Sequence, residues 1–242
     1  MPRDPVADSL YQKGIAAFKS GNAVLALEAM KQVRQFHPDD PDALYFQAVC
    51  LLRLEQGDVA QPLLRRLTEV KSNDFYLLQG HLLLAWHHAG KGRLEAAEDE
   101  LHALLKKNYE NPQVYSILGY IYFMRHDYPQ AEYYYQKALA LDKNNPNAHN
   151  GLGNTYLEWG EKRELALPHL EKALSERPGY FAYLDSIGWM HYLKQNLGRA
   201  LFYLTKALRT RRHPIIQQHL NEAHKAEQYG FPAPAPLSRP NP

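Results

Sequence analysis

The sequence predicts an all-α solenoid, and three observations support that prediction. Small residues recur along the 242-residue chain in two series, with steps of 34 to 37 residues. Apolar residues at helical spacing form paired segments, which turn residues such as Gly21-Asn22 separate. A proline stands at the expected start of several helices, as in Asp40-Pro41. Because one helix pair cannot bury its own apolar faces, neighbouring pairs must stack.

The two series of small residues mark where the helices of each pair cross. Close packing of two antiparallel helices needs small side chains at the crossing point, on both partners. The second series follows the first by 12 residues, or by 13 in the fifth pair. The first series consists of Gly14, Ala48, Ala85, Gly119, Gly153 and Gly188, and the second of Ala26, Ala60, Ala97, Ala131, Ala166 and Ala200.

Each expected element has its own local signal. Asn111-Pro112, Asn145-Pro146 and His213-Pro214 predict helix starts in the same way as Asp40-Pro41. Residues 75–77 are extra, so the first helix of the third pair is expected to begin a turn early. The interval from Gly160 to Ala166 is one residue longer than its counterparts in the other pairs, which predicts a lengthened turn in the fifth pair.

After the sixth pair, apolar residues at helical spacing predict one more helix, which covers the exposed end of the stack. Proline-rich sequence then predicts a flexible tail. The expected organisation is an extension at 1–6, a solenoid at 7–228 with pairs at 7–40, 41–74, 78–111, 112–145, 146–180 and 181–214 and a capping helix at 214–228, and a tail at 229–242.

The pattern resembles the tetratricopeptide repeat (TPR), whose 34-residue unit carries Leu-Gly, Tyr, two alanines and a proline at set positions. The fourth pair carries Leu118-Gly119, Tyr122, Ala131 and Ala138 at these positions, and the second and third pairs are weaker, with Ala48 and Ala85 in place of the glycine. The resemblance covers about residues 7–214, and it implies a right-handed α-solenoid that binds protein partners. The segment from Asp185 to Trp189 resembles bacterial TPR proteins, so a bacterial source is expected.

In the TPR family the first helix of each pair, helix A, lines the concave face of the solenoid. In the family, set positions of each helix A point into this groove. We call the residues at these positions in this sequence the A-helix stripe. It is unusually apolar and aromatic, and such side chains dominate binding hot spots. The A-helix stripe is expected to contain Tyr11, Ile15, Tyr45, Val49, Leu82, Trp86, Ser116, Tyr120, Phe123, Asn150, Asn154, Asp185, Trp189 and Tyr192. The alternative is that these rings fill the inside of a tight superhelix and contact nothing foreign.

The last third of the chain carries a local excess of positive charge. No Asp or Glu occurs from Ser186 to Asn221. A basic patch of this kind favours an acidic partner or an anionic surface. The alternative is a solvated face, with cations at a helix C-terminus. The patch consists of Lys194, Arg199, Lys206, Arg209, Arg211 and Arg212.

Composition and motifs argue against several other classes of protein. Hydrophobic residues make up 45% of the chain and charged residues 22%, so a mostly disordered chain is excluded. Cys50 is the single cysteine, so neither a disulfide framework nor a cysteine zinc site is expected. The twelve histidines show no recognised metal spacing, and no catalytic or cofactor motif occurs. We therefore expect neither an enzyme, a metal site nor a cofactor.

The expected partner is a protein or peptide, held by an adaptor, assembly factor or chaperone. A net charge of +2 does not favour nucleic acid, although a nucleic-acid binder or an undetected enzyme stays as a further alternative. Self-assembly is another, in which the groove takes the tail at 231–236 of a second copy or the stack ends meet. The sequence predicts no transmembrane segment and a cytoplasmic location, or an envelope association if a targeting signal has been removed.

Overall fold

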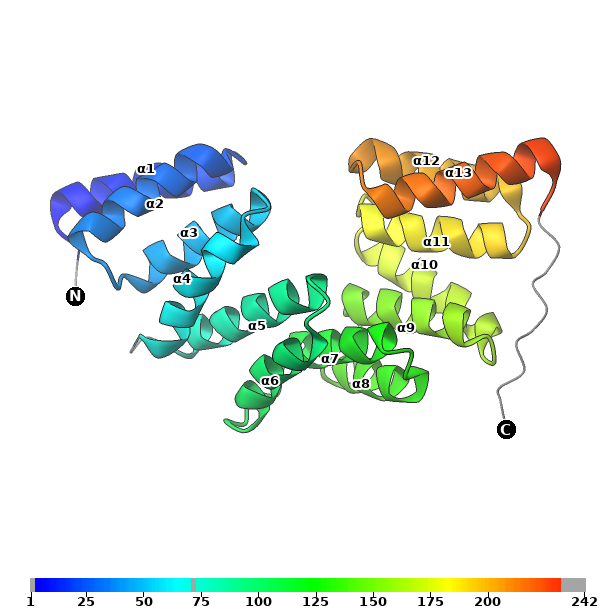
Figure 1. Cartoon of the computed structure of the whole chain (residues 1–242), viewed down its shortest axis with the longest axis horizontal. Helices are drawn as coiled ribbons and strands as arrows, with labels where there is room; N and C mark the ends of the chain where they lie inside the picture. The colour runs from blue at the N-terminus through cyan, green and yellow to red at the C-terminus, as the bar shows by residue number, and fades with distance from the viewer. Residues whose placement is uncertain (1–2, 71–72, 232–242) are drawn as a thin grey trace. The chain divides into compact units, whose positions relative to one another are not determined.

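The computed structural model describes residues 3–70 and 73–231, and it confirms the all-α prediction (Figure 1). Within those ranges the chain forms thirteen α-helices and one short 3-10 helix, and no strand. The helices are α1 Pro5–Lys19, α2 Ala23–Phe36, α3 Pro41–Arg53, α4 Gly57–Glu69, α5 Asp74–Gly90, α6 Leu94–Leu105, α7 Pro112–Met124, α8 Tyr128–Leu141, α9 Pro146–Trp159, α10 Ala166–Glu176, α11 Phe181–Leu193, α12 Leu197–Thr210 and α13 Pro214–Tyr229, with the 3-10 helix η1 at Arg163–Leu165.

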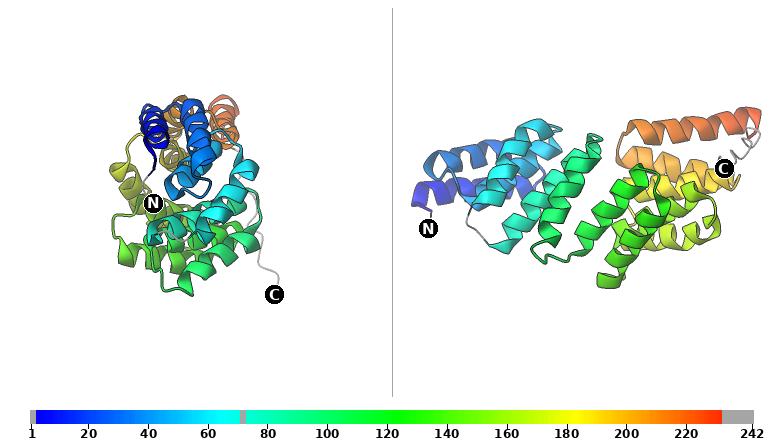
Figure 2. Two further views of the ribbon diagram at one scale, coloured as in Figure 1. Left: turned by 90° about the vertical axis from the view of Figure 1, so that its left-hand side faces the viewer. Right: turned by 60° about the horizontal axis from the view of Figure 1, so that its bottom comes forward.

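The chain divides into two compact units between Ile121 and Tyr122, a point that lies within α7. In the first unit, α1 to α6 form three antiparallel helix pairs (Figures 1 and 2). In the second, α8 to α13 continue the pattern and end on the unpaired helix α13. Within each pair, helix A has an odd number and helix B an even number.

Small residues allow close crossings of paired helices, as the sequence predicts. A Cβ atom added to Gly153 would lie 2.6 Å from Leu170 Cδ2 of α10, and one added to Gly188 would lie 2.8 Å from Leu204 Cγ of α12. Both leucines are fully buried in a closely packed interior, so their side chains cannot move aside for a larger residue. The second series lies equally deep: Ala26, Ala60, Ala97, Ala131, Ala166 and Ala200 are all fully buried.

The Asx-Pro signals operate as helix caps. The Asp40 carboxylate accepts a hydrogen bond from the Ala43 amide at 2.9 Å, and the Asn145 side chain accepts one from Ala148 at 3.0 Å. Asp4 caps α1 by the same chemistry, so this helix begins at Pro5, two residues before the expected start. The missed signal was Asp4-Pro5, which has the same form as the others.

The two expected irregularities are present. Helix α5 begins at Asp74, capped by Asn73, and so includes the extra residues as an added N-terminal turn. In the fifth pair, α9 ends at Trp159 and the 3-10 helix Arg163–Leu165 fills the lengthened connection before α10. Insertions in this fold therefore lengthen a helix or a turn without moving the crossing points.

One residue in each A-to-B turn adopts a left-handed backbone conformation. Glycine tolerates positive φ angles, whereas other residues are strained there. The six residues, with their φ angles, are Gly21 (83°), Glu55 (61°), Gly92 (72°), His126 (59°), Gly160 (81°) and Gln195 (57°). The same bend thus recurs at the repeat period along the described chain.

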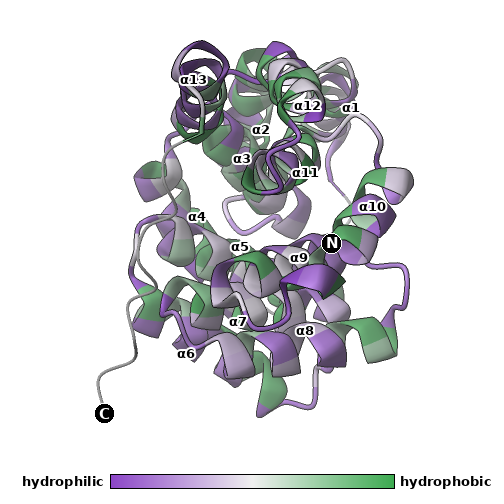
Figure 3. Ribbon diagram, turned by 90° about the vertical axis from the view of Figure 1, so that its right-hand side faces the viewer, coloured by the Kyte–Doolittle hydropathy of each residue, from purple (hydrophilic) through white to green (hydrophobic). Residues whose placement is uncertain are grey.

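Helix α13 covers the last pair. It contacts both α12 and α11, and it buries Ile216, Leu220, Ala223 and Ala226. Hydrophobic and hydrophilic residues both lie on this helix, as expected of an amphipathic cap (Figure 3). Beyond it, Phe231 packs against Tyr192, with ring centroids 5.4 Å apart. Residues 232–242, which hold most of the expected tail, lie outside the described residues.

Candidate protein-interaction surface

In the first unit, aromatic side chains join successive A helices. The ring of Tyr11 on α1 lies 6.3 Å from that of Phe46 on α3, and Tyr45 on α3 lies 5.7 Å from Phe75 on α5. Edge-to-face pairs of this kind stabilise packing beyond the area they bury. Part of the A-helix stripe therefore holds neighbouring helix pairs together.

Trp86 and Tyr120 form the most accessible aromatic pair of the A-helix stripe. Their rings are 5.6 Å apart, and 56% of Trp86 is exposed to solvent. Tyr120 is half-buried, and this burial raises the pKa of its phenol, which stays protonated at neutral pH. Its hydroxyl makes no hydrogen bond to any residue that the structure describes. The pair offers one large apolar face and one hydroxyl without a partner among the described residues.

Other members of the A-helix stripe present little surface. Leu82, Ser116 and Tyr192 are buried. The Ser116 hydroxyl donates a hydrogen bond to the Pro112 carbonyl of its own helix. Ile15 is half-buried against the cluster around Met30. Packing between successive helices determines which side chains of the A-helix stripe reach solvent.

The remaining apolar members are partly buried. Val49 is half-buried on α3, and Phe123 lies 6.3 Å from Tyr128 on α8. Trp189 stacks between two rings, 4.7 Å from Tyr192 and 4.3 Å from His219 of α13. These contacts lie within single units.

Two of the four polar members of the A-helix stripe, Asn154 and Asp185, bond to the next odd-numbered helix. The Asn154 amide on α9 donates to the Ser186 hydroxyl on α11 at 3.0 Å. His219 Nδ1 on α13 donates to the Asp185 carboxylate on α11 at 2.9 Å. Ser116 bonds within its own helix, and the buried Oδ1 atom of Asn150 has no hydrogen-bond partner among the described residues. Asn154 and Asp185 thus act first as links between helices.

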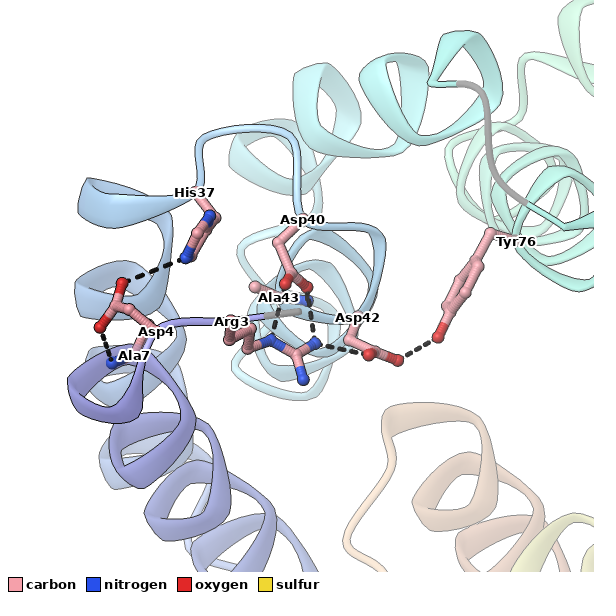
Figure 4. Close-up of polar contacts among 8 residues, drawn as sticks. All are labelled: Arg3, Asp4, Ala7, His37, Asp40, Asp42, Ala43 and Tyr76. Carbon is pink, nitrogen blue, oxygen red and sulfur yellow. Dashed lines mark hydrogen bonds and ion pairs between the residues drawn. The ribbon is translucent and has the colours of Figure 1, made fainter. Parts of the chain in front are cut away.

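A polar network at the start of the chain, which the sequence analysis did not identify, ties α1, α3 and α5 together (Figure 4). The Arg3 guanidinium donates to Asp40 at 2.6 Å and to Asp42 at 2.5 Å, and the Tyr76 hydroxyl donates to Asp42. Burial acts to raise the pKa of Asp40, but the bonds from Arg3 and the Ala43 amide outweigh it and the pKa is lowered. Asp40-Pro41 gave a helix start, but no sequence signal linked it to Arg3.

Several histidines lie between α4, α5 and α6. His81 Nδ1 is 2.8 Å from the Glu100 carboxylate, which also pairs with Arg65. His88 is buried, and neither of its ring nitrogens has a partner in the part of the chain that the structure describes. No group of three or more His, Cys, Asp or Glu side chains there has the geometry of a metal site.

The basic patch occupies α12 and its two flanking turns. Arg199, Lys206 and Arg209 are exposed on the helix, and Lys194 follows α11. Arg211 differs from these, because its guanidinium lies 5.0 Å from the centre of the Phe181 ring. Arg212 lies in the turn before α13.

Residues 11–180 match the model of a protein family described as the tetratricopeptide repeat protein 21 C-terminal ARM domain. The chain belongs to this tetratricopeptide repeat family. It is 30% identical over 135 residues to human superkiller complex protein 3, covering 54% of this chain and 8% of that protein. It is also 30% identical over 151 residues to a TPR repeat-containing protein of Pseudomonas aeruginosa, covering 61% of this chain and 25% of that protein. The chain therefore spans a quarter or less of these relatives.

Solved structures share the fold at low sequence identity. The anaphase-promoting complex hetero-tetramer Cut9-Hcn1 has a TM-score of 0.74 at 18% identity, over 90% of this chain and 42% of that chain. PilW, described as a type IV pilus biogenesis factor, has a TM-score of 0.67 at 18% identity, over 90% and 99%. PilF of Pseudomonas aeruginosa has a TM-score of 0.64 at 18% identity, over 90% and 98%. These likenesses establish the TPR fold. None of the helices within residues 3–70 and 73–231 combines the length and the hydropathy that a transmembrane span requires.

Proposed function

We propose that this chain is a non-catalytic protein-binding scaffold, whose first unit holds a partner segment against Trp86 and Tyr120. The observation that supports this most directly is the paired rings, with the indole more than half exposed on a rigid helical frame. The relatives support a scaffold role in general, since one structural neighbour is part of the multi-protein complex APC/C and another is a type IV pilus biogenesis factor.

The geometry suits an apolar side chain of a partner peptide or helix. Aromatic side chains give up little conformational entropy on binding and remove a large area from water. The rings of Trp86 and Tyr120 are already held side by side, so the partner does not have to order them. The Tyr120 hydroxyl adds one directional bond, which would help select a partner with a nearby acceptor.

The test is a comparison of partner capture by the wild-type chain and by Trp86→Ala and Tyr120→Ala variants, read out by quantitative mass spectrometry. Affinity for any captured partner is then measured with purified proteins. Loss of a buried aromatic anchor costs about 2 kcal/mol, so we expect binding to weaken roughly 30-fold while helicity is unchanged.

Phe36→Ala is the matched control, because Phe36 is similarly exposed but ends the B helix α2. We expect this variant to bind like the wild type. Equal affinity of all three variants for the captured partner would reject the assignment of the Trp86–Tyr120 pair.

A further inference from the structure

The outer face of α12 carries a regular row of side chains that the proposed function does not use. Arg199, Phe202, Lys206 and Arg209 are spaced by three, four and three residues, so they lie on one side of the helix. We call this row the α12 stripe. The opposite side of the helix holds Ala200, Leu204 and Ala207, which are fully buried. The α12 stripe therefore faces solvent for the length of the helix.

The charge of the α12 stripe is not balanced locally. Arg199, Lys206 and Arg209 form no ion pair with any residue that the structure describes. Phe202, at the centre of the row, is 60% exposed. An exposed phenylalanine flanked by three cations offers an apolar contact surrounded by positive charge, which is complementary to a partner that is both apolar and negatively charged.

A hollow extends the basic surface beyond the end of α12. It has a volume of about 450 Å³ and is lined by Leu208, Arg212, His213, Pro214 and Gln217. None of these residues is acidic, and the first turn of α13 has no acidic residue either. The hollow is large enough to take one side chain of a molecule lying along α12.

We propose that the α12 stripe docks an acidic amphipathic helix of a partner protein. Spacing by three and four residues is the spacing of the contacting positions along a helix–helix seam. An apolar residue of the partner would cover Phe202, and carboxylates would lie opposite Arg199, Lys206 and Arg209. The chain's own C-terminal segment does not fit, because residues 228–242 contain no Asp or Glu.

A single helix fits the charge distribution better than a broad anionic surface. Glu171 on α10 is exposed, and its charge acts to raise the pKa of His191. The ring of His191 stacks on Tyr203 of α12, with centroids 5.7 Å apart, so Glu171 lies near α12. Glu222 on α13, the helix packed next to α12, pairs with Lys225. A membrane or a nucleic acid extending past α12 would also meet carboxylates on the neighbouring helices, whereas the charged residues that a helix along the α12 stripe meets are all cations.

The experiment uses the full chain and three designed helical peptides, with binding measured by titration calorimetry. The first peptide carries three glutamates around one leucine at the spacing of the α12 stripe. The second and third carry glutamine or lysine in place of glutamate. We expect the glutamate peptide to bind, and the double variant Arg199→Glu/Lys206→Glu to weaken it by ~10-fold or more. The lysine peptide should bind that double variant better than it binds the wild type.

Lys106→Glu/Lys107→Glu is the control, since it makes the same change in net charge after α6 in the first unit. It should retain binding, as should Trp86→Ala, which separates this surface from the Trp86–Tyr120 pair. Phe202→Ala should weaken binding several-fold. The proposal is overturned if the glutamine peptide binds as tightly as the glutamate peptide, if the two double variants lose binding equally, or if only phosphatidylserine vesicles or single-stranded RNA bind.

Discussion

At the scale of single residues, His88 stands out because a titratable imidazole is buried in the first unit. It is 3% exposed, and both ring nitrogens lack hydrogen bonds among the described residues. Burial lowers the pKa of His88; Arg65, His87 and Arg93 lower it further, while Glu100 acts in the opposite direction. The folded chain therefore holds this ring in its neutral form at pH values where an exposed histidine is partly charged.

This predicts a loss of stability in mild acid. The unfolded chain binds a proton at His88 near pH 6.5, whereas the folded chain does so only at lower pH. The stabilisation that comes from burying neutral His88 is thus complete above the pKa of the unfolded chain, and it falls as the pH drops below that value. We expect the free energy of unfolding in urea to decrease from pH 7 to pH 5, and to decrease less in His88→Leu.

The decrease should persist in part, because burial also lowers the pKa values of His169 and His191. His224→Leu, at an exposed position of α13, controls for the loss of an imidazole as such. A wild-type pH dependence in His88→Leu would contradict the assignment.

At the scale of the helix pair, the left-handed turn residues carry a measurable cost. Gln195 and Gly92 occupy equivalent turns, with φ angles of 57° and 72°. A non-glycine residue in this region costs about 1 kcal/mol or more, which the greater freedom of glycine in the unfolded chain offsets in part. We expect Gln195→Gly to raise the free energy of unfolding by up to about 1 kcal/mol and Gly92→Ala to lower it by a similar amount. Urea unfolding of both variants measures the difference, and a change of the same sign in both would contradict this reading.

Much of the helix order follows from sequence because its signals are local. A capping side chain and a following proline determine a helix start within a few residues, as at Asp40-Pro41 and Asn145-Pro146. The exposed members of the A-helix stripe could not be predicted in this way. Whether Trp86 stays in solvent while Tyr192 is buried depends on side chains from other segments, such as Tyr120 of α7 and Phe231 after α13, which no local signal specifies.

At the scale of the whole molecule, the end of the second unit depends on α13. Ile216 of this helix is 1% exposed and packs in a cluster with Leu184 and Ala207, whereas the adjacent Ile215 is 52% exposed. The two isoleucines therefore provide a matched pair. We expect Ile216→Ala to lower the free energy of unfolding by ~2–4 kcal/mol and Ile215→Ala to change it by less than about 0.5 kcal/mol. Thermal and urea unfolding measure both, and equal effects would show that α13 does not cover the stack as described.

Because Trp86 is exposed, its fluorescence can show whether a ligand is bound at the Trp86–Tyr120 pair. Trp159 and Trp189 are partly covered and stack against Tyr128 and His219, respectively, whereas most of the Trp86 indole meets water. Light emitted by an indole shifts to shorter wavelength when water leaves its surroundings. Binding of a ligand to Trp86 should therefore shift the intrinsic fluorescence emission to shorter wavelength, which can be measured without a label on either molecule.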